Sequence, residues 1–112
     1  MAAELELVTY DEAAAALGVP LRRVTQLLSD GELVAVVTAD GARRIPADFL
    51  QDGAVVKALA AVIRLLRDAH YQDDEIIEWI FRPDDSLPGA PIQALRENRG
   101  REVKRRAQVA GF

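Results

Sequence analysis

The spacing of apolar and polar residues along this chain predicts a series of short helices. In residues 21–29 the apolar side chains recur every three or four positions, as on the buried face of a helix; they are Leu21, Val24, Leu27 and Leu28. The same spacing continues through residues 54–69, where the apolar positions are Val55, Val56, Leu59, Val62, Ile63, Leu66 and Ala69. A further helix is expected over residues 73–81, capped by Asp73 or Asp74, and two more over residues 91–96 and 100–110.

Capping signals predict one more helix and a tight turn near the N-terminus. Thr9 and Glu12 have the spacing of a capping box, and the alanine-rich segment 11–17 that follows favours a helix. Gly18 suits the left-handed backbone at a helix end, and Pro20 suits the first turn of the next helix. Two helices joined by a tight turn are therefore expected.

A β-hairpin is predicted to follow this pair of helices. Residues 33–38 are apolar and β-branched, and residues 43–45 can form a second short strand. Between them, Asp40 and Gly41 form one of the strongest short hairpin signals.

The order of helix, turn, helix and hairpin indicates the fold class. We expect a mainly α protein with a small two-stranded β wing. A winged helix-turn-helix would occupy residues 1–52, and a C-terminal helical unit over residues 53–112 would share or abut the same core.

Composition narrows the function classes. The 112 residues include no cysteine, which excludes disulfides, thiolate metal sites and cysteine nucleophiles. The apolar runs are far shorter than the ~20 residues of a membrane span. The opening Met-Ala-Ala-Glu carries no basic residue ahead of an apolar stretch, as a signal peptide would. We therefore expect a cytoplasmic protein that does not enter a membrane and is located at the nucleoid.

The net charge of −4 is distributed unevenly. Residues 96–112 carry six basic residues and two acidic ones. Because phosphate contacts depend on local basic surface, an acidic chain can still have a face for nucleic acid.

The outward face of the helix over residues 21–29 has the side chains to read double-stranded DNA. Arginine can bond guanine with two hydrogen bonds, glutamine can do so with adenine, and hydroxyl groups suit phosphates. The predicted DNA-binding residues on this helix are Arg22, Arg23, Thr25, Gln26 and Ser29, and those on the wing are Arg43 and Arg44.

The last helix carries a second set of cations. The predicted auxiliary phosphate contacts are Arg101, Lys104 and Arg105, with Arg99 and Arg106 on the same side. The alternative is a solvated face in which Glu102 pairs with Arg105 or Arg106.

Acidic residues lie beside the predicted contacts of the helix over residues 21–29 and of the wing; they are Asp30, Glu32 and Asp40. These acids should weaken phosphate binding, so we expect modest affinity for DNA with a steep salt dependence.

Catalytic signals are weak. His70 is the sole histidine and lies at a predicted helix end, where a capping or core-edge role is usual. An acidic cluster of Asp73, Asp74, Glu75 and Glu78 stands where carboxylates complement a helix dipole, rather than at metal-ligand spacing. No phosphate loop or nucleophile elbow occurs. We expect no enzyme activity, no metal and no cofactor.

The N-terminal half resembles a known family. Its segments are Thr9-Tyr10-Asp11-Glu12-Ala13-Ala14, Leu17-Gly18-Val19, Gly31-Glu32-Leu33-Val34-Ala35-Val36 and Arg43-Arg44-Ile45-Pro46. In this order they resemble the excisionase and MerR-type winged helix-turn-helix. The resemblance covers residues 8–50 and implies DNA binding.

The C-terminal half is similar to the toxin-binding domain of the Xre/MbcA/ParS antitoxins. The likeness rests on Trp79, then Pro83-Asp84 to Pro91, then Gly100-Arg101-Glu102-Val103. We expect Trp79 and Phe81 to be core residues, with Leu87 turned back toward the core.

The whole chain most resembles small actinobacterial, mycobacterial-type winged-helix DNA-binding proteins. That likeness implies DNA binding, as a transcriptional regulator or a nucleoid-associated factor. The alternative is an antitoxin-like interaction module whose C-terminal half binds a toxin. Pairing of two chains on DNA is left open, because winged helices of this type often form dimers but no heptad seam is visible.

Overall fold

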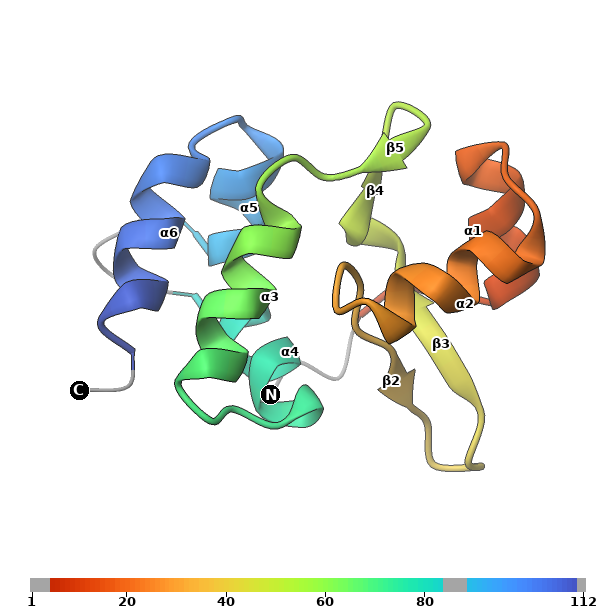
Figure 1. Ribbon diagram of the computed structural model, residues 1–112, viewed down its shortest axis with the longest axis horizontal. Coiled ribbons are helices and arrows are strands. Elements are labelled where there is room, and N and C mark those ends of the chain that lie inside the picture. Colours follow the sequence, from red (N-terminus) through yellow and green to blue (C-terminus); the bar gives the residue numbers. More distant parts are fainter. Residues whose placement is uncertain (1–4, 84–88, 111–112) are drawn as a thin grey trace.

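The computed structural model describes residues 5–83 and 89–110 of the chain. Figure 1 shows α1, α2 and the wing on one side and α3 to α6 on the other. The elements, in chain order, are β1 (Leu7–Val8), α1 (Tyr10–Leu17), α2 (Leu21–Ser29), β2 (Val36–Val37), β3 (Arg43–Pro46), the 3₁₀ turn η1 (Ala47–Phe49), β4 (Leu50–Gln51), β5 (Ala54–Val55), α3 (Leu59–Asp68), α4 (Asp73–Phe81), α5 (Pro91–Arg96) and α6 (Gly100–Gln108). The predicted fold class, a winged helix followed by a helical unit, is confirmed.

The capping signals act as predicted. The backbone N–H of Glu12 donates to the Thr9 hydroxyl at 3.0 Å, and the N–H of Thr9 donates to the Glu12 carboxylate at 2.8 Å. Gly18 adopts the left-handed conformation, with φ +68°, and directs the chain into α2. Because glycine enters this region without steric cost, the turn between the helices can be short.

The sheet has one more strand than the sequence indicated. Its order is β1-β3-β2 and all pairs are antiparallel, with Val8 opposite Ile45 and Val36 opposite Arg44. Strand β1 is two residues long, which is too short to show an alternating pattern. The wing strand β2 is also shorter than the predicted segment 33–38, because Leu33 and Val34 enter the core as irregular backbone.

The helix predicted over residues 54–69 starts later, at Leu59. Strands β4 and β5 form a hairpin instead, through a turn in which Asp52 and Gly53 have φ +54° and φ +78°. Two successive left-handed residues define the type I′ turn that Asp-Gly favours. The prediction was wrong here because Val55 and Val56, which follow that turn, were assigned to the apolar period of the helix.

Several helix-end predictions also need correction. The N-cap of α4 is Gln72 and not Asp73 or Asp74, and α6 ends at Gln108 rather than at residue 110. Leu21, expected to be buried, is 46% exposed because it lies at the very start of α2. His70 is exposed and left-handed, with φ +72°, so it ends α3 as expected of a capping residue.

A single cluster of buried apolar residues joins the two halves of the chain. Phe49 is fully buried, and its ring lies 5.5 Å from that of Phe81 in α4. Trp79 and Phe81 are partly buried and pack against this core. The expectation for Leu87 lies outside the described residues. Among the described residues, no helix is both long and apolar enough to cross a membrane.

Polar contacts reinforce this junction. The guanidinium of Arg96, at the end of α5, donates to the carbonyls of Asp48 at 2.8 Å and Leu50 at 2.9 Å. In return, the Gln51 side chain donates to the carbonyl of Arg96 at 3.2 Å. The segment that carries Phe49 is thus tied to the C-terminal helices.

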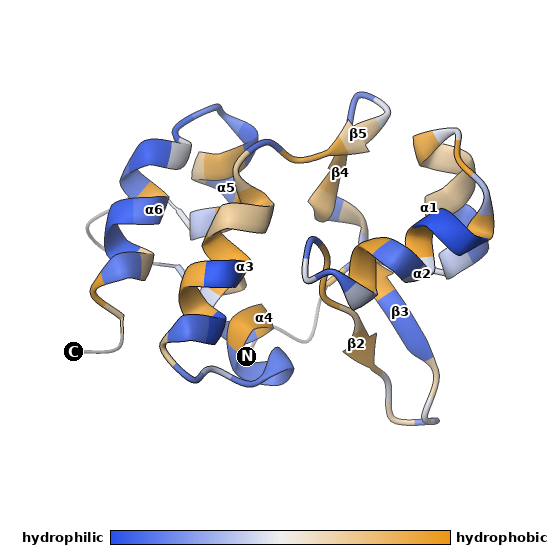
Figure 2. Cartoon of the chain, in the orientation of Figure 1, coloured by the Kyte–Doolittle hydropathy of each residue, from blue (hydrophilic) through white to orange (hydrophobic). Residues whose placement is uncertain are grey.

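Helices α3 and α6 approach closely where both begin. A Cβ built on Gly100 would lie 2.7 Å from the Cβ of Ala58, which precedes α3. Ala58 itself is left-handed, with φ +73°. Figure 2 shows α6 as mainly hydrophilic, and this helix buries only Val103 and Ala107. The absence of a side chain at Gly100 therefore decides how closely α6 can approach.

Gly100→Ala should destabilise the protein by about 1–3 kcal/mol, the usual cost of overpacking a close contact. Because the clashing atom is the Cβ of Ala58, adding Ala58→Gly should recover most of the loss. Urea unfolding of the single and double variants measures both effects. A double variant as unstable as Gly100→Ala would contradict this contact.

Arg96→Met should lower the free energy of unfolding by about 1–3 kcal/mol, because it keeps an apolar stem but removes two charge-assisted hydrogen bonds. Urea unfolding followed by Trp79 fluorescence measures the change. The control is Arg82→Met, whose exposed pair with Glu78 should contribute less than about 1 kcal/mol. Equal losses in the two variants would argue against the role of Arg96.

Candidate nucleic-acid interface

Helix α2 has a buried face and a polar face. Val24 is fully buried and Leu27 is 6% exposed, and both belong to the core that contains Ala13 of α1. All five residues predicted to face DNA are exposed: Arg22, Arg23, Thr25, Gln26 and Ser29. The apolar spacing that holds α2 against α1 therefore leaves these five side chains in solvent.

The polar face of α2 changes in charge along its length. Arg22 and Arg23 lie in the first turn, at the positive end of the helix dipole. Asp30 and Glu32 follow the last turn. Thr25 donates its hydroxyl proton to the carbonyl of Arg22 at 2.9 Å, so its oxygen is left to accept rather than donate. The N-terminal half of α2 is thus the half suited to an anion.

The wing turn is built around Asp40. Its carboxylate accepts hydrogen bonds from the Thr38 hydroxyl and from the Ala42 N–H, the latter at 3.2 Å. The N–H of Thr38 donates to the carbonyl of Ala42 at 2.8 Å, and Gly41 adopts φ +85°. The hydrogen bond from Thr38, followed by that from Ala42, holds the pKa of Asp40 below its ordinary value of 3.8.

The two wing arginines do not share a face. Arg43 and Arg44 are consecutive in β3, so their side chains point to opposite sides of the sheet. Arg43 is exposed, whereas Arg44 is half-buried and donates to the carbonyl of Arg43 at 3.1 Å. The structure therefore gives the two residues different access to a ligand, although the sequence analysis grouped them.

A groove of about 700 Å³ separates the wing from the C-terminal helices. Its apolar wall comes from the end of α2, from β2 and from α4. Arg43 and the ion pair of Arg67 with Asp73, at 3.0 Å, are among its polar lining.

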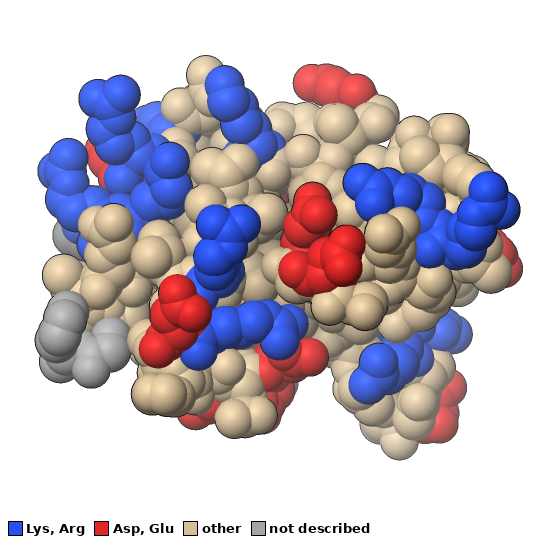
Figure 3. Space-filling model, viewed as in Figure 1, with Lys and Arg blue, Asp and Glu red and all other residues tan. Residues whose placement is uncertain are grey.

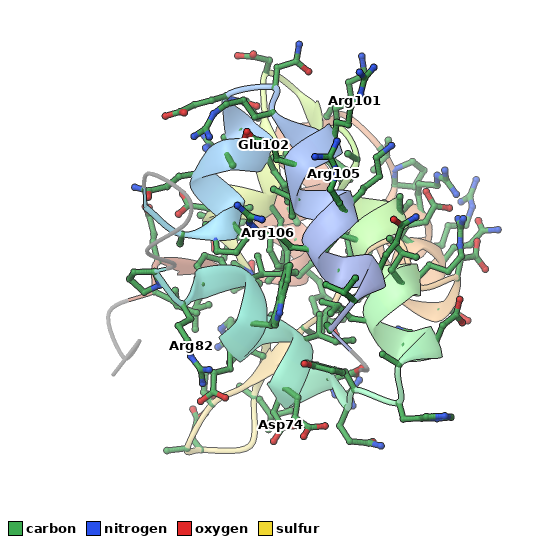
Figure 4. The ribbon with its side chains drawn as sticks, turned by 90° about the vertical axis from the view of Figure 1, so that its left-hand side faces the viewer. Asp74, Arg82, Arg101, Glu102, Arg105 and Arg106 are labelled. Atoms are coloured by element: carbon green, nitrogen blue, oxygen red, sulfur yellow. The ribbon has the colours of Figure 1, made fainter. Side chains whose placement is uncertain are left out.

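On α6, the predicted auxiliary cations Arg101, Lys104 and Arg105 are exposed. Glu102 lies 3.5 Å from Arg99 of the same region, and Arg99 also pairs with Glu97 at 2.7 Å. Of the two partners predicted for Glu102, Arg105 forms no ion pair with it in the described part of the chain. Figure 4 shows Arg101 and Arg105 along α6, on the opposite side of this view from Arg82.

Figure 3 shows Lys and Arg side chains over α2, the wing, α3 and α6 on one face of the molecule. Acidic side chains lie between α2 and α3. On the α3 side, Lys57 and Arg64 are exposed cations that the sequence analysis did not single out. The helical period did contain this signal, because Ile63 and Leu66 point inward and position 64 therefore points outward.

The acidic cluster of α4 is engaged in local structure. Asp73 pairs with Arg67, and Glu78 pairs with Arg82 at 2.8 Å. Asp74 accepts from the N–H of Glu75 at 3.0 Å, and the Glu75 carboxylate accepts from the N–H of Gln72 at 2.7 Å. Within the described residues, no three His, Asp or Glu side chains gather in a way that could hold a metal ion.

Comparisons with known proteins match both halves of the chain. Residues 1–50 match the family model of the wHTH domain of "DNA-binding protein Rv2175c". Residues 56–111 match the model of the Rv2175c C-terminal domain, a domain of unknown function. The resemblance of the two halves to excisionase or MerR-type proteins and to antitoxins is not confirmed by these matches.

A curated relative and a solved structure agree with these family models. The "DNA-binding protein Rv2175c" of Mycobacterium tuberculosis is 39% identical over an alignment of 118 residues. The alignment covers 93% of this chain and 81% of the relative. The NMR structure of Rv2175c superposes with a TM-score of 0.89 at 36% identity, and covers 100% of this chain and 85% of that one.

The carboxyl group of Asp40 should titrate below 3.8 in the folded protein. Its hydrogen bonds favour the charged form, so their contribution to wing stability is present above pH 3.8 and is lost as pH falls through the lower, folded-state pKa. Thr38→Val should raise the pKa of Asp40 toward 3.8. Carbon-detected NMR titration of both proteins measures this shift, and an unchanged midpoint in Thr38→Val would contradict it.

Proposed function

The chain belongs to the Rv2175c family of winged helix-turn-helix proteins, and we propose that it is itself a DNA-binding protein that inserts α2 into the major groove of double-stranded DNA. The relative's name and the match over residues 1–50 support DNA binding. The winged-helix geometry supports the use of α2, because in such proteins the N-terminal residues of the second helix meet the base edges.

One observation carries the proposal. Arg22 and Arg23 are exposed at the basic end of α2, and neither has an ion pair within the described part of the chain. A helix about 10–12 Å in diameter fits the major groove, which is about 12 Å wide. Arginines left without a protein partner keep their donors for guanine or phosphate.

The other predicted contacts have distinct roles in this proposal. Gln26, one turn after Arg22 and Arg23, can bond adenine with two hydrogen bonds. Thr25 lies at one edge of the polar face and Ser29 at its C-terminal end, and both contact the DNA backbone. Arg43 reaches a phosphate or the adjoining minor groove from the exposed face of the wing, and half-buried Arg44 contributes less.

The acidic residues set the orientation of α2 in the groove. Asp30 and Glu32 would face phosphates if the C-terminal end of α2 entered deeply, and each such approach is repulsive. The N-terminal end therefore enters first. The expected affinity is modest and falls steeply with salt.

In the cell, we propose that the protein acts as a transcriptional regulator or a nucleoid-associated factor in the cytoplasm, without enzymatic activity. Selection of bound fragments from random duplex DNA separates these roles. A regulator enriches fragments that share one sequence, whereas a nucleoid factor enriches fragments that share a base composition or a DNA shape. Pairing of two chains on a palindrome, and a protein partner for the C-terminal half, stay predictions.

Replacing Arg22 and Arg23 by alanine should weaken binding to a 20-base-pair duplex by roughly 30-fold or more, from the loss of two arginine contacts at about 1–3 kcal/mol each. Fluorescence anisotropy at low salt measures the affinity. The control, Arg82→Ala, removes a cation that pairs with Glu78 and should change binding less than about twofold.

Two results would overturn the proposal. Unchanged affinity in the Arg22→Ala, Arg23→Ala variant would show that α2 is not the reading helix. A parent protein that binds no duplex at low salt would instead favour the antitoxin-like alternative, in which the C-terminal half binds a protein.

A further inference from the structure

We propose that α3 and α6 form a second phosphate-binding surface that contacts the same duplex as α2. This inference rests on the proposed function and extends it to the C-terminal domain. The surface, called here the C-terminal basic surface, consists of Lys57, Arg64, Arg101, Lys104 and Arg105.

The cations of the C-terminal half fall into two groups. Some are engaged within the protein: Arg67 pairs with Asp73, Arg82 with Glu78 and Arg99 with Glu97, and Arg96 bonds backbone carbonyls. The five members of the C-terminal basic surface are exposed and, within residues 5–83 and 89–110, form no ion pair. The same holds for Arg22 and Arg23. Exposed cations that form no ion pair within the described residues are thus found on α2, on the wing (Arg43) and on the C-terminal basic surface.

The contact between Gly100 and Ala58 places the five cations together. Helices α3 and α6 pack side by side, begin at this contact and run in the same direction (Figure 1). Lys57 and Arg101 adjoin the contact directly. At 1.5 Å per residue, Arg64 lies ~9 Å along from Ala58, and residues 104–105 lie ~6–8 Å along from Gly100. The two helices therefore present their cations at matching heights.

The C-terminal basic surface shares a face with the winged helix. Figure 3 shows the cations over α3 and α6 on the same side of the molecule as those over α2 and the wing. The longest extent of the protein is 36 Å, and α2 and α6 lie toward opposite ends of that axis. One turn of duplex spans about 34–36 Å. A single chain can therefore follow the backbone over nearly one turn.

The composition of the surface favours a nucleic-acid backbone over an acidic protein. The apolar residues of α6, Val103 and Ala107, are buried in the core, so the exposed face offers charge without an apolar centre. Protein interfaces usually have such a centre and are depleted in charge there. Asp68, at the end of α3, is the one acidic residue within α3, and it lies at the end away from the Gly100 contact.

The salt dependence of binding tests this inference. Substitution of all five cations by glutamine (Lys57→Gln, Arg64→Gln, Arg101→Gln, Lys104→Gln and Arg105→Gln) should reduce the slope of log K against log salt by roughly 4–5, at about 0.9 for each of the five lost phosphate contacts. The probe is a 20-base-pair duplex of random sequence with the full chain. Circular dichroism checks that the variant is folded.

A matched pair of single substitutions supplies the control. Arg105→Gln should lower the slope by about 0.9, whereas Arg82→Gln, with the same change in charge, should leave it unchanged. If the fivefold variant does not fold, this pair of single variants still tests whether the C-terminal basic surface contacts phosphates.

The outcomes distinguish this inference from the proposed function. If the fivefold variant, or Arg105→Gln, keeps the parent slope while Arg22→Ala, Arg23→Ala loses binding, the C-terminal surface is overturned and the winged-helix function stands. If the parent binds no duplex at all, both are overturned.

Discussion

The burial of Phe49 between the two halves of the chain is the contact on which the rest of the structure depends. Its ring is fully buried against Phe81, and Arg96 bonds the carbonyls on either side of it. A further contact between the two halves is that of α4 with β2. Because the junction lies in one continuous core, the wing and the C-terminal helices hold a defined position relative to each other.

This rigidity matters for the binding of a polyanion that is proposed for this acidic protein. With a net charge of −4, attraction to DNA must come from one face, and repulsion from the rest must be kept at a distance. The ion pairs of Arg67, Arg82 and Arg99 neutralise acids locally, while other cations remain available on the face shown in Figure 3. A surface held by the core before binding also loses less conformational entropy on binding.

Much of this arrangement could be predicted from local signals. The capping box at Thr9, the glycine at position 18 and the apolar stripe of α2 each act over a few residues, so they specify α1, the turn and α2 without tertiary help. The Asp40-Gly41 turn likewise predicts the wing. The Asp52-Gly53 turn had the same kind of signal, but the apolar residues directly after it were assigned to the helix that follows.

The order of the helices and the wing, and the side of α2 that carries arginine, follow from the sequence alone, because helical periodicity and turn chemistry depend on neighbours in the chain. Tertiary structure alone decided that β1 pairs with β3, that Arg43 and Arg44 differ in exposure, and that Lys57 and Arg64 adjoin the cations of α6. These outcomes depend on contacts between distant segments, such as Gly100 against Ala58. No local pattern encodes the distance between two such residues.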